Sequence, residues 1–118
     1  MNIQSDREAT LLHLLAQTSK RSGVLNGNIA NINTPGYKRR EVSFEHAMAQ
    51  AIERGGSMLE VEAETTIDEA TPGRIDGNNV DLERELALKD QNGVLYDAYL
   101  TLLESHYRAL DAAIQSGR

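Results

Sequence analysis

The feature that most constrains the fold is an unbroken seven-residue repeat near the end of the chain. Steps of four and three residues keep side chains on one face of an α-helix, and such a repeat is typical of a coiled-coil seam. We predict this helix over residues 82–115, with Asp81 as its cap and a stop at Gly117. The ten positions of the repeat are Leu82, Leu86, Lys89, Gly93, Tyr96, Leu100, Leu103, Tyr107, Leu110 and Ile114.

A second repeat of the same spacing lies near the N-terminus. It runs through Leu11, Leu15, Thr18, Ser22, Leu25, Ile29 and Ile32. Each seam needs an apolar cover, so we expect the two helices to pack antiparallel, seam against seam. A hairpin of this kind buries little surface alone, and we expect partly disordered termini in the free monomer. Six residues beside the seams are expected to remain as surface for neighbours: Leu12, Leu14, Leu88, Val94, Leu95 and Leu102.

Local signals set the bounds of the first helix. Ser5 and Glu8 have the spacing of a capping box, which predicts a start near Asp6. The segment Thr34–Tyr37, with the sequence Thr-Pro-Gly-Tyr, ends the helix by about Asn33, because proline cannot continue a helix and restricts the residue before it. Proline followed by glycine also fits the central positions of a type II turn.

A basic cluster and a short helix are predicted after this turn. Residues 38–40, Lys-Arg-Arg, are interpreted as a solvated exit from the turn. Ser43 is expected to cap a helix that Gly55 and Gly56 stop. The apolar residues of this helix have helical spacing: Phe44, Ala47, Met48, Ala51 and Ile52.

The remainder of the middle segment alternates between apolar and polar residues. Over residues 59–68 this alternation predicts a β-strand with a solvated acidic face, since successive side chains of a strand point to opposite sides. Residues 74–76 are predicted to form a short return strand. The predicted fold is therefore mainly α, an antiparallel coiled-coil hairpin of two long helices with a short helix and a small β or irregular middle segment.

Composition excludes several classes of function. The net charge of −6 argues against nucleic acid as a partner, and the absence of cysteine excludes thiolate metal sites. No run of residues is long and apolar enough to span a membrane, and residues 1–8 do not look like a cleaved secretory signal. His13, His46 and His106 lack metal-ligand spacing. We find no active site and expect neither catalysis nor a cofactor.

Residues 28–37 resemble the N-terminal signature of the bacterial flagellar rod and hook proteins, in which Ala-Asn-x-x-Thr-Pro-Gly-Tyr recurs. The matching positions are Asn28, Ala30, Asn31, Thr34, Pro35, Gly36 and Tyr37. Residues 79–85, Asn-Val-Asp-Leu-Glu-Arg-Glu, are similar to the entry into the C-terminal helix of these proteins. Together the resemblance covers about residues 10–44 and 78–115. The length and ending of the chain are most similar to proximal-rod members of the family.

The resemblance implies a fold and a role. Residues 1–33 with 79–118 would form a terminal-helix core domain, and residues 34–78 an insert. The chain would be a structural subunit of the proximal rod, assembling through its helices into a drive shaft across the periplasm. Its partners would be further copies, other rod subunits, the basal adaptor at the membrane ring and the flagellar type III export apparatus, with no cleaved signal. Phe44 and Met48 resemble an export-gate segment, although a docked short helix explains them equally well.

Two other roles remain open. A distal-rod or hook subunit shares the Thr-Pro-Gly-Tyr motif, but such subunits usually carry larger outer domains than 118 residues allow. A cytosolic helical-hairpin adaptor explains the seams and the acidity, but it gives no reason for the motif.

Overall fold

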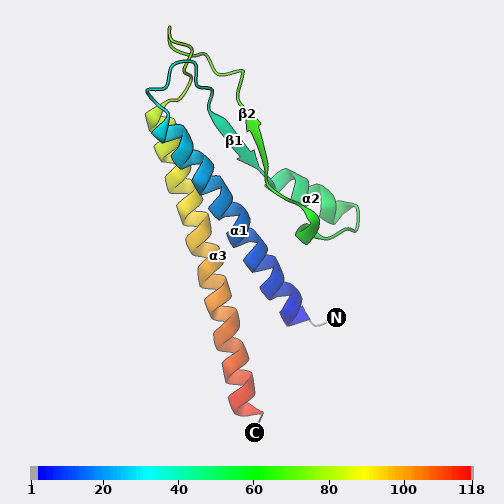
Figure 1. Ribbon diagram of the computed structural model, residues 1–118. Coiled ribbons are helices and arrows are strands. Elements are labelled where there is room, and N and C mark those ends of the chain that lie inside the picture. The colour runs from blue at the N-terminus through cyan, green and yellow to red at the C-terminus, as the bar shows by residue number, and fades with distance from the viewer. Residues whose placement is uncertain (1–2, 118) are drawn as a thin grey trace.

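The structure is a computed structural model that describes residues 3–117. Two long helices dominate it, α1 (Ile3–Ala30) and α3 (Leu82–Ser116). They run antiparallel and side by side, and α1 lies between α3 and the middle segment (Figure 1). The predicted mainly α fold, with two long helices and a small sheet, is confirmed.

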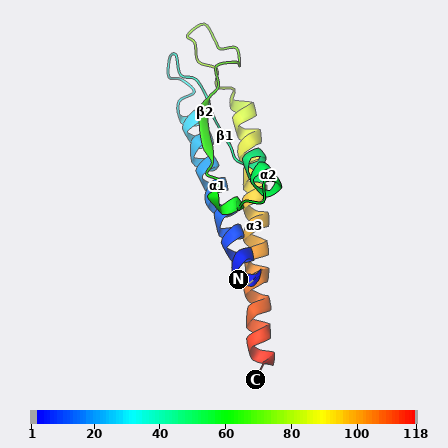
Figure 2. The same cartoon turned by 90° about the vertical axis from the view of Figure 1, so that its right-hand side faces the viewer.

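The middle segment folds into a small unit beside α1 (Figures 1 and 2). It contains β1 (Arg40–Ser43), α2 (Glu45–Glu53), a 3₁₀ turn (Met58–Glu60) and β2 (Glu64–Ile67). The two strands pair antiparallel, with the first residue of β1 opposite the last residue of β2. The sheet therefore joins the chain that leaves the Pro-Gly turn to a segment more than twenty residues later.

The predicted strand over residues 59–68 is only partly correct. Its first part is the 3₁₀ turn, in which the Ser57 hydroxyl accepts a hydrogen bond from Leu59 N at 3.1 Å. The predicted return strand over residues 74–76 is wrong, because Gly77 N bonds Arg74 O at 2.8 Å and closes a turn there. The actual partner of β2 is β1.

The bounds predicted from the sequence agree more closely with the observed bounds for α3 than for α1. Asp81 caps α3 by accepting a hydrogen bond from Glu83 N at 3.0 Å, and Gly117 is its C-cap. Ser5 lies inside α1, so the predicted capping box is wrong; no helix breaker stands between Ile3 and Ser5 to start the helix later.

The short helix α2 forms where the sequence predicts it, but with a different start. Ser43 is the last residue of β1 and not a helix cap, because the strand pairing extends through it. Phe44 takes the N-cap position without a side-chain bond. Gly55, with φ of +77°, ends the helix as predicted.

A compact apolar core lies between the middle segment and α1. It is formed by Val42, Phe44, Met48 and Ala63, with half-buried Leu14 and Val24 of α1 packed against it. Phe44 is 1% exposed and is the largest apolar side chain in this core. Burial of these side chains contributes to holding the middle segment on α1.

The molecule as a whole is long and thin. Its extents are 68 × 30 × 15 Å, and its radius of gyration is 18.4 Å. A compact domain of this length has a radius of gyration of about 13 Å. Much of the surface of the two long helices is therefore left uncovered.

Candidate functional site

The Thr34–Tyr37 turn has the geometry that its sequence predicts. Gly36 has a φ of +74°, and Tyr37 N donates to Thr34 O at 3.2 Å. Positive φ at this position favours glycine because a Cβ would be strained there. Gly36 N also donates to Asp76 O at 2.8 Å, so the turn is bonded to the segment between β2 and α3.

Asn28 connects α1 to both the turn and α3. Its side chain is fully buried. The carboxamide oxygen accepts hydrogen bonds from Arg40 N at 2.9 Å and from the Tyr37 hydroxyl at 3.1 Å. The amide nitrogen donates to Arg40 O at 2.8 Å and to Glu85 Oε2 at 3.0 Å. One side chain thus uses its donors and its acceptor to hold three segments together.

Asn78 performs a similar role from the other side of the junction. It is fully buried, and its amide nitrogen lies within 3.1 Å of the carbonyl oxygens of Asn31, Ile32 and Thr34. Carbonyls just beyond a helix end have no partner within the helix and need one from elsewhere. The segment that leads into α3 therefore supplies the cap for the end of α1.

These contacts bring the two segments that carry the family resemblance together. Residues 28–37 and residues 78–85 are far apart in the sequence, yet they form the two halves of one junction at the closed end of the hairpin. The sequence alone did not show that the two motifs are in contact.

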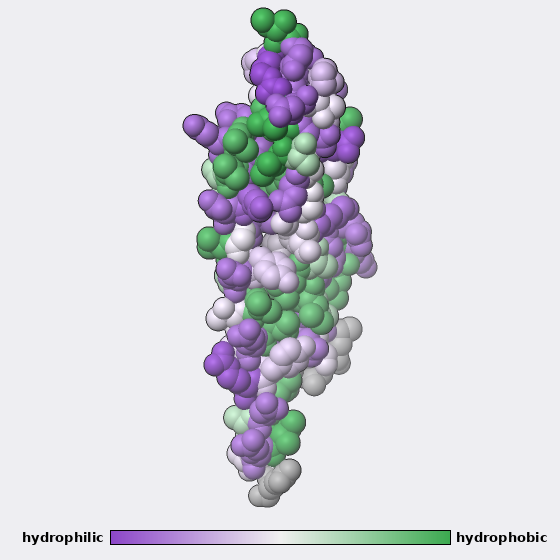
Figure 3. Space-filling view, turned by 60° about the vertical axis from the view of Figure 1, so that its left-hand side comes forward, coloured by the Kyte–Doolittle hydropathy of each residue, from purple (hydrophilic) through white to green (hydrophobic). Residues whose placement is uncertain are grey.

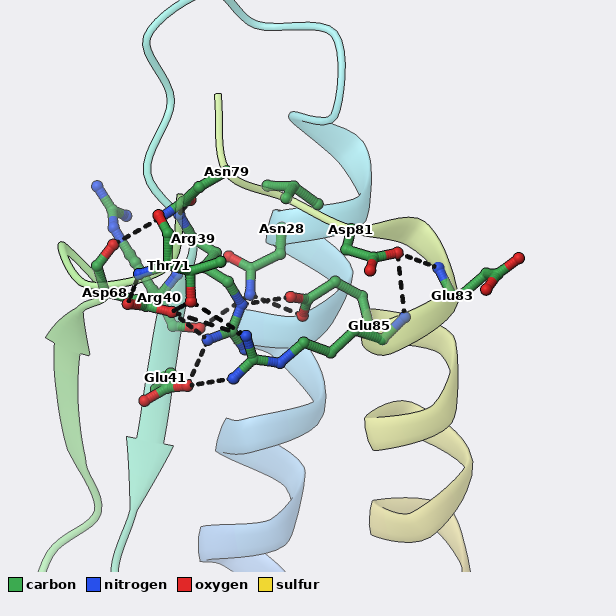
Figure 4. Close-up of polar contacts among 12 residues, drawn as sticks. Asn28, Arg39, Arg40, Glu41, Asp68, Thr71, Asn79, Asp81, Glu83 and Glu85 are labelled. Carbon is green, nitrogen blue, oxygen red and sulfur yellow. Dashed lines mark hydrogen bonds and ion pairs between the residues drawn. The ribbon is translucent and has the colours of Figure 1, made fainter. Parts of the chain in front are cut away.

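An ion cluster, formed by Arg39, Glu41, Asp68 and Glu85, lies in this junction, with the exposed Glu41 at its edge (Figure 4). Arg39 is 1% exposed and Glu85 is completely buried. Arg39 Nε donates to Glu85 Oε1 at 2.5 Å, and Nη1 donates to Asp68 Oδ2 at 3.0 Å and to Glu41. The cluster joins β1, the end of β2 and the first turns of α3.

The side chain of Asn79 holds the backbone at Arg39 and at Asp68. Arg39 N donates to Asn79 Oδ1 at 2.6 Å, and the amide nitrogen of Asn79 donates to Asp68 O at 2.7 Å. Burial alone would lower the pKa of Arg39, but its bonds to Glu85, Glu41 and Asp68 raise that pKa overall. The side chain therefore remains charged.

Asp68 is held in its ionised form. The Thr71 hydroxyl donates to it at 2.6 Å and Thr71 N at 3.0 Å, and these bonds, with the bond from Arg39, hold the pKa of Asp68 well below its usual range. The expectation that this carboxylate belongs to a solvated acidic face is wrong for Asp68, although Glu60, Glu62 and Glu64 are exposed as predicted.

The interpretation of residues 38–40 as a solvated cluster is wrong for Arg39. The carboxylates that accept its hydrogen bonds come from positions 68 and 85 as well as from its neighbour at 41, so no local sequence pattern predicts the pairing. Lys38 is half-buried and bonds Gly77 O at 2.5 Å, while Arg40 is exposed.

The face of α3 that packs in the hairpin is not the predicted seam. The buried or half-buried row consists of Glu85, Leu88, Asn92, Leu95, Tyr99, Leu103, His106 and Leu110. Two of its polar members are bonded across the interface: Glu85 accepts from Asn28, and Asn92 donates to Thr18 O at 2.8 Å and accepts from Arg21 Nε at 2.8 Å. Because this row contains charged and polar residues, an apolar repeat in the sequence does not reveal it.

Of the predicted seam of α3, only Leu103 is buried and Leu110 half-buried. Seam-against-seam packing is therefore wrong for this helix. The physical reason is that two rows with the same spacing lie next to each other, and bonds such as Asn28 to Glu85 select the more polar row for the hairpin. Lys89, Gly93 and six large apolar residues of the seam are exposed. We call these six apolar residues the outer row: Leu82, Leu86, Tyr96, Leu100, Tyr107 and Ile114, each between 36% and 63% exposed.

The outer row runs along the side of α3 that borders α1. The Tyr107 hydroxyl donates to Glu8 Oε1 of α1 at 2.9 Å. Figure 3, seen from the side on which α3 lies in Figure 1, shows apolar surface over much of the length, separated by polar groups. The outer row is thus only partly covered within the described part of the chain, since its six side chains remain 36% to 63% exposed.

The predicted seam of α1 is buried or half-buried throughout. Leu11, Thr18 and Leu25 are buried, and the other members, Leu15, Ser22, Ile29 and Ile32, are half-buried. Among the residues expected beside the seams, Leu12, Val94 and Leu102 are exposed, whereas Leu14, Leu88 and Leu95 are half-buried.

The proposed export segment lies in the interior of the folded chain. Phe44 is 1% exposed and Met48 is 4% exposed, and both belong to the core that holds the middle segment on α1. The fold therefore gives them a packing role.

Residues 3–117 give little support for a metal site or for a membrane-spanning helix. No group of three potential metal ligands converges there. His13 Nε2 lies 2.6 Å from Val61 O and serves to attach the middle segment to α1. No helix in this range is long and apolar enough to cross a bilayer.

Several known proteins are similar to this chain in sequence, and those described below share one name. No family model matches the chain. The flagellar basal body rod protein FlgB of Escherichia coli (strain K12) is 30% identical over 125 aligned positions, covering 90% of this chain and 88% of that protein. FlgB of Aeromonas hydrophila is 30% identical, covering 87% and 88%, and FlgB of Bacillus subtilis (strain 168) is 26% identical over the full length of both. The chain therefore belongs to the family of the flagellar basal body rod protein FlgB.

Proposed function

We propose that this chain is a structural, non-catalytic subunit of the proximal rod, which polymerises through its terminal helices into the drive shaft that transmits torque across the periplasm. The family makes it a component of the flagellar basal body rod. The outer row of α3 is the observation that supports the finer role, since six large apolar side chains along one helix remain exposed. An exposed apolar surface of this extent marks a site of protein association.

The proposed subunit has two parts. Residues 1–33 with 79–118 form the core that contacts neighbours, and residues 34–78 form an insert that packs on α1 and meets α3 at the junction. Open contacts between different surfaces of successive subunits do not close on themselves and propagate as a helical assembly. The neighbours are further copies, other rod subunits and the basal adaptor at the membrane ring.

A single charge in the outer row tests this role. Leu100→Asp places a carboxylate on the proposed contact surface, at a side chain that is 36% exposed and outside the buried row of the hairpin, so we expect a folded protein and no motility in a flagellate strain that lacks its own copy. Thr101→Asp, at the next and exposed position of α3, is the matched control and is expected to leave motility intact. Normal motility of the Leu100→Asp strain would refute the proposed contact.

The chain is proposed to leave the cytoplasm through the flagellar type III apparatus, without a cleaved signal, and Phe44 with Met48 to be recognised during export. Because both side chains are buried in the folded chain, recognition requires the middle segment to be unfolded. Deleting residues 44–48 is expected to stop secretion, whereas deleting residues 50–54 from the same helix is not. Equal secretion of both deletion variants would exclude these residues as the signal.

A further inference from the structure

A line of carboxylates follows the outer row of α3. Five acidic residues recur at a constant spacing of seven: Glu83, Asp90, Asp97, Glu104 and Asp111. All five are exposed, and none takes part in an ion pair within residues 3–117. Seven residues make nearly two full helical turns, so these side chains form one strip along the helix.

The strip occupies a defined position relative to the outer row. In a coiled coil the apolar seam is flanked on each side by one residue per heptad, and the charges there determine which partner binds. Glu104 stands four positions after Leu100, and Asp111 stands four positions after Tyr107, so the strip is one such flank. The other flank contains Glu85, Asn92 and His106, which are buried in the hairpin. Only the acidic flank is therefore available to a neighbour.

Basic residues on the same helix do not cancel this charge. α3 has three basic residues. Arg84 is turned toward the junction, where its guanidinium donates to Glu41 Oε1 at 3.1 Å. Lys89 lies within the predicted seam, and Arg108 lies beyond the acidic strip, four positions after Glu104. Three positive charges against the five negative ones leave the strip net negative.

The arrangement disfavours pairing of the outer row with the same row of a second copy. Antiparallel pairing places the acidic strips against each other, and parallel pairing requires the flank that the hairpin already occupies. The exposed side of α1 offers no basic line either. Lys20 bonds Ala63 O, Arg21 bonds Glu45 of the middle segment and Asn92 of α3, and Arg7 is a single exposed charge.

We infer that the outer row binds a helix of a different chain, one that is apolar along one face and carries lysine or arginine along the adjoining flank. This inference rests on the proposed function, because it names the kind of neighbour that covers the outer row. Contacts between identical copies then use other surfaces of the molecule.

The test uses two synthetic four-heptad helical peptides with the same apolar row, one with lysine and one with glutamate at the flanking positions. Binding to the full-length protein is measured by fluorescence anisotropy at low and at high salt. We expect the lysine peptide to bind at least roughly tenfold more tightly at low salt, and the preference to shrink at about 1 M salt, where charges are screened within about 3 Å. Equal binding, or no binding of either peptide, overturns the inference.

Charge-reversal variants show whether peptide binding depends on the acidic strip or on the net negative charge of the chain. The triple variant Asp90→Lys, Asp97→Lys, Glu104→Lys is expected to prefer the glutamate peptide. Its matched control makes the same charge change on exposed residues of the middle segment, Glu60→Lys, Glu62→Lys, Glu64→Lys, and is expected to keep the preference for lysine. If the control loses the preference instead, binding reflects net charge and the inference fails.

Leu100→Asp distinguishes this inference from the proposed function. It is expected to lose both peptides, which places their binding on the outer row. A preference for lysine that survives in Leu100→Asp overturns the inference, while loss of motility in the same variant continues to support the proposed contact.

Discussion

A buried arginine needs several acceptors, and Arg39 takes them from three parts of the chain: Glu41, Asp68 and Glu85. Asn28 and Asn79 complete the arrangement with bonds to a carboxylate and to the backbone. At the scale of single residues, the closed end of the hairpin is thus a polar junction. Its stability depends on complete pairing, because a buried charge without a partner is costly.

Removing Arg39 alone is therefore expected to destabilise the fold more than removing Arg39 and Glu85 together. Arg39→Met leaves the carboxylate of Glu85 buried beside Asn28 alone, and we expect a loss of about 3–5 kcal/mol in the free energy of unfolding. The double variant Arg39→Met, Glu85→Leu is expected to recover much of that loss. Urea unfolding followed by circular dichroism measures both, and a single variant within about 1 kcal/mol of the parent would contradict the role of the cluster.

Acid is expected to weaken the same cluster through Asp68. The folded-state pKa of this carboxyl lies below its ordinary value of 3.8, so its contribution to stability is fully present above that pH. As the pH falls below about 4, the unfolded chain takes up the proton first and the contribution is lost. The stability difference between the parent and Asp68→Asn should therefore be largest near neutral pH and should narrow below pH 4. If the parent and Asp68→Asn differ in stability by the same amount at pH 7 and at pH 3, the ionised Asp68 carboxylate does not stabilise the cluster.

Single residues show clearly where the sequence is informative and where it is not. The Pro-Gly turn and the Asp81 cap depend on neighbours in the chain, and both were predicted correctly. The burial of Arg39 depends on residues at positions 68 and 85, and no local pattern could reveal it. The motif residue Asn28 was identified by resemblance, but its partners were visible only in the structure.

At the scale of elements, α3 carries two rows that serve different purposes. The row through Glu85, Asn92 and His106 packs in the hairpin, and the outer row remains free. Periodicity predicted the helix and its length, because every row of an α-helix shares the same repeat. It could not decide which row faces α1, because that choice depends on bonds from α1 such as those to Asn92.

The partner of β2 could not be predicted from the sequence for a comparable reason. Alternation predicts a strand but does not name its partner, and the nearest candidate, residues 74–76, forms a turn instead. The true partner, β1, follows the Pro-Gly turn. The sequence instead favours a solvated basic cluster for residues 38–40 and a helix cap for Ser43.

Two leucines three positions apart test the assignment of the rows. Leu103 is 7% exposed and Leu100 is 36% exposed. Leu103→Ala leaves a cavity in the hairpin and is expected to cost about 2–5 kcal/mol of unfolding free energy, whereas Leu100→Ala is expected to cost less than about 1 kcal/mol. Thermal and urea unfolding of the two variants provide the comparison. Equal losses would mean that both residues pack in the hairpin.

At the scale of the whole molecule, the extended shape is consistent with a part that is completed by its neighbours. The radius of gyration of 18.4 Å and the uncovered outer row have the same origin, because α3 is covered by α1 along one side only. The membership in the FlgB family places such a subunit in the flagellar rod, where other chains are available to cover it. The insert on the far side of α1 leaves the outer row unobstructed.

Thiol protection measures this coverage directly, because the chain contains no cysteine and each introduced cysteine is the only one. Leu100→Cys and Leu103→Cys are labelled with a maleimide in the isolated protein and in purified basal bodies. We predict that the cysteine at position 100 reacts in the isolated protein and is protected in the basal body, while the one at position 103 is slow to react in both. A cysteine at position 100 that reacts equally fast in both states would contradict the claim that the outer row is the assembly surface.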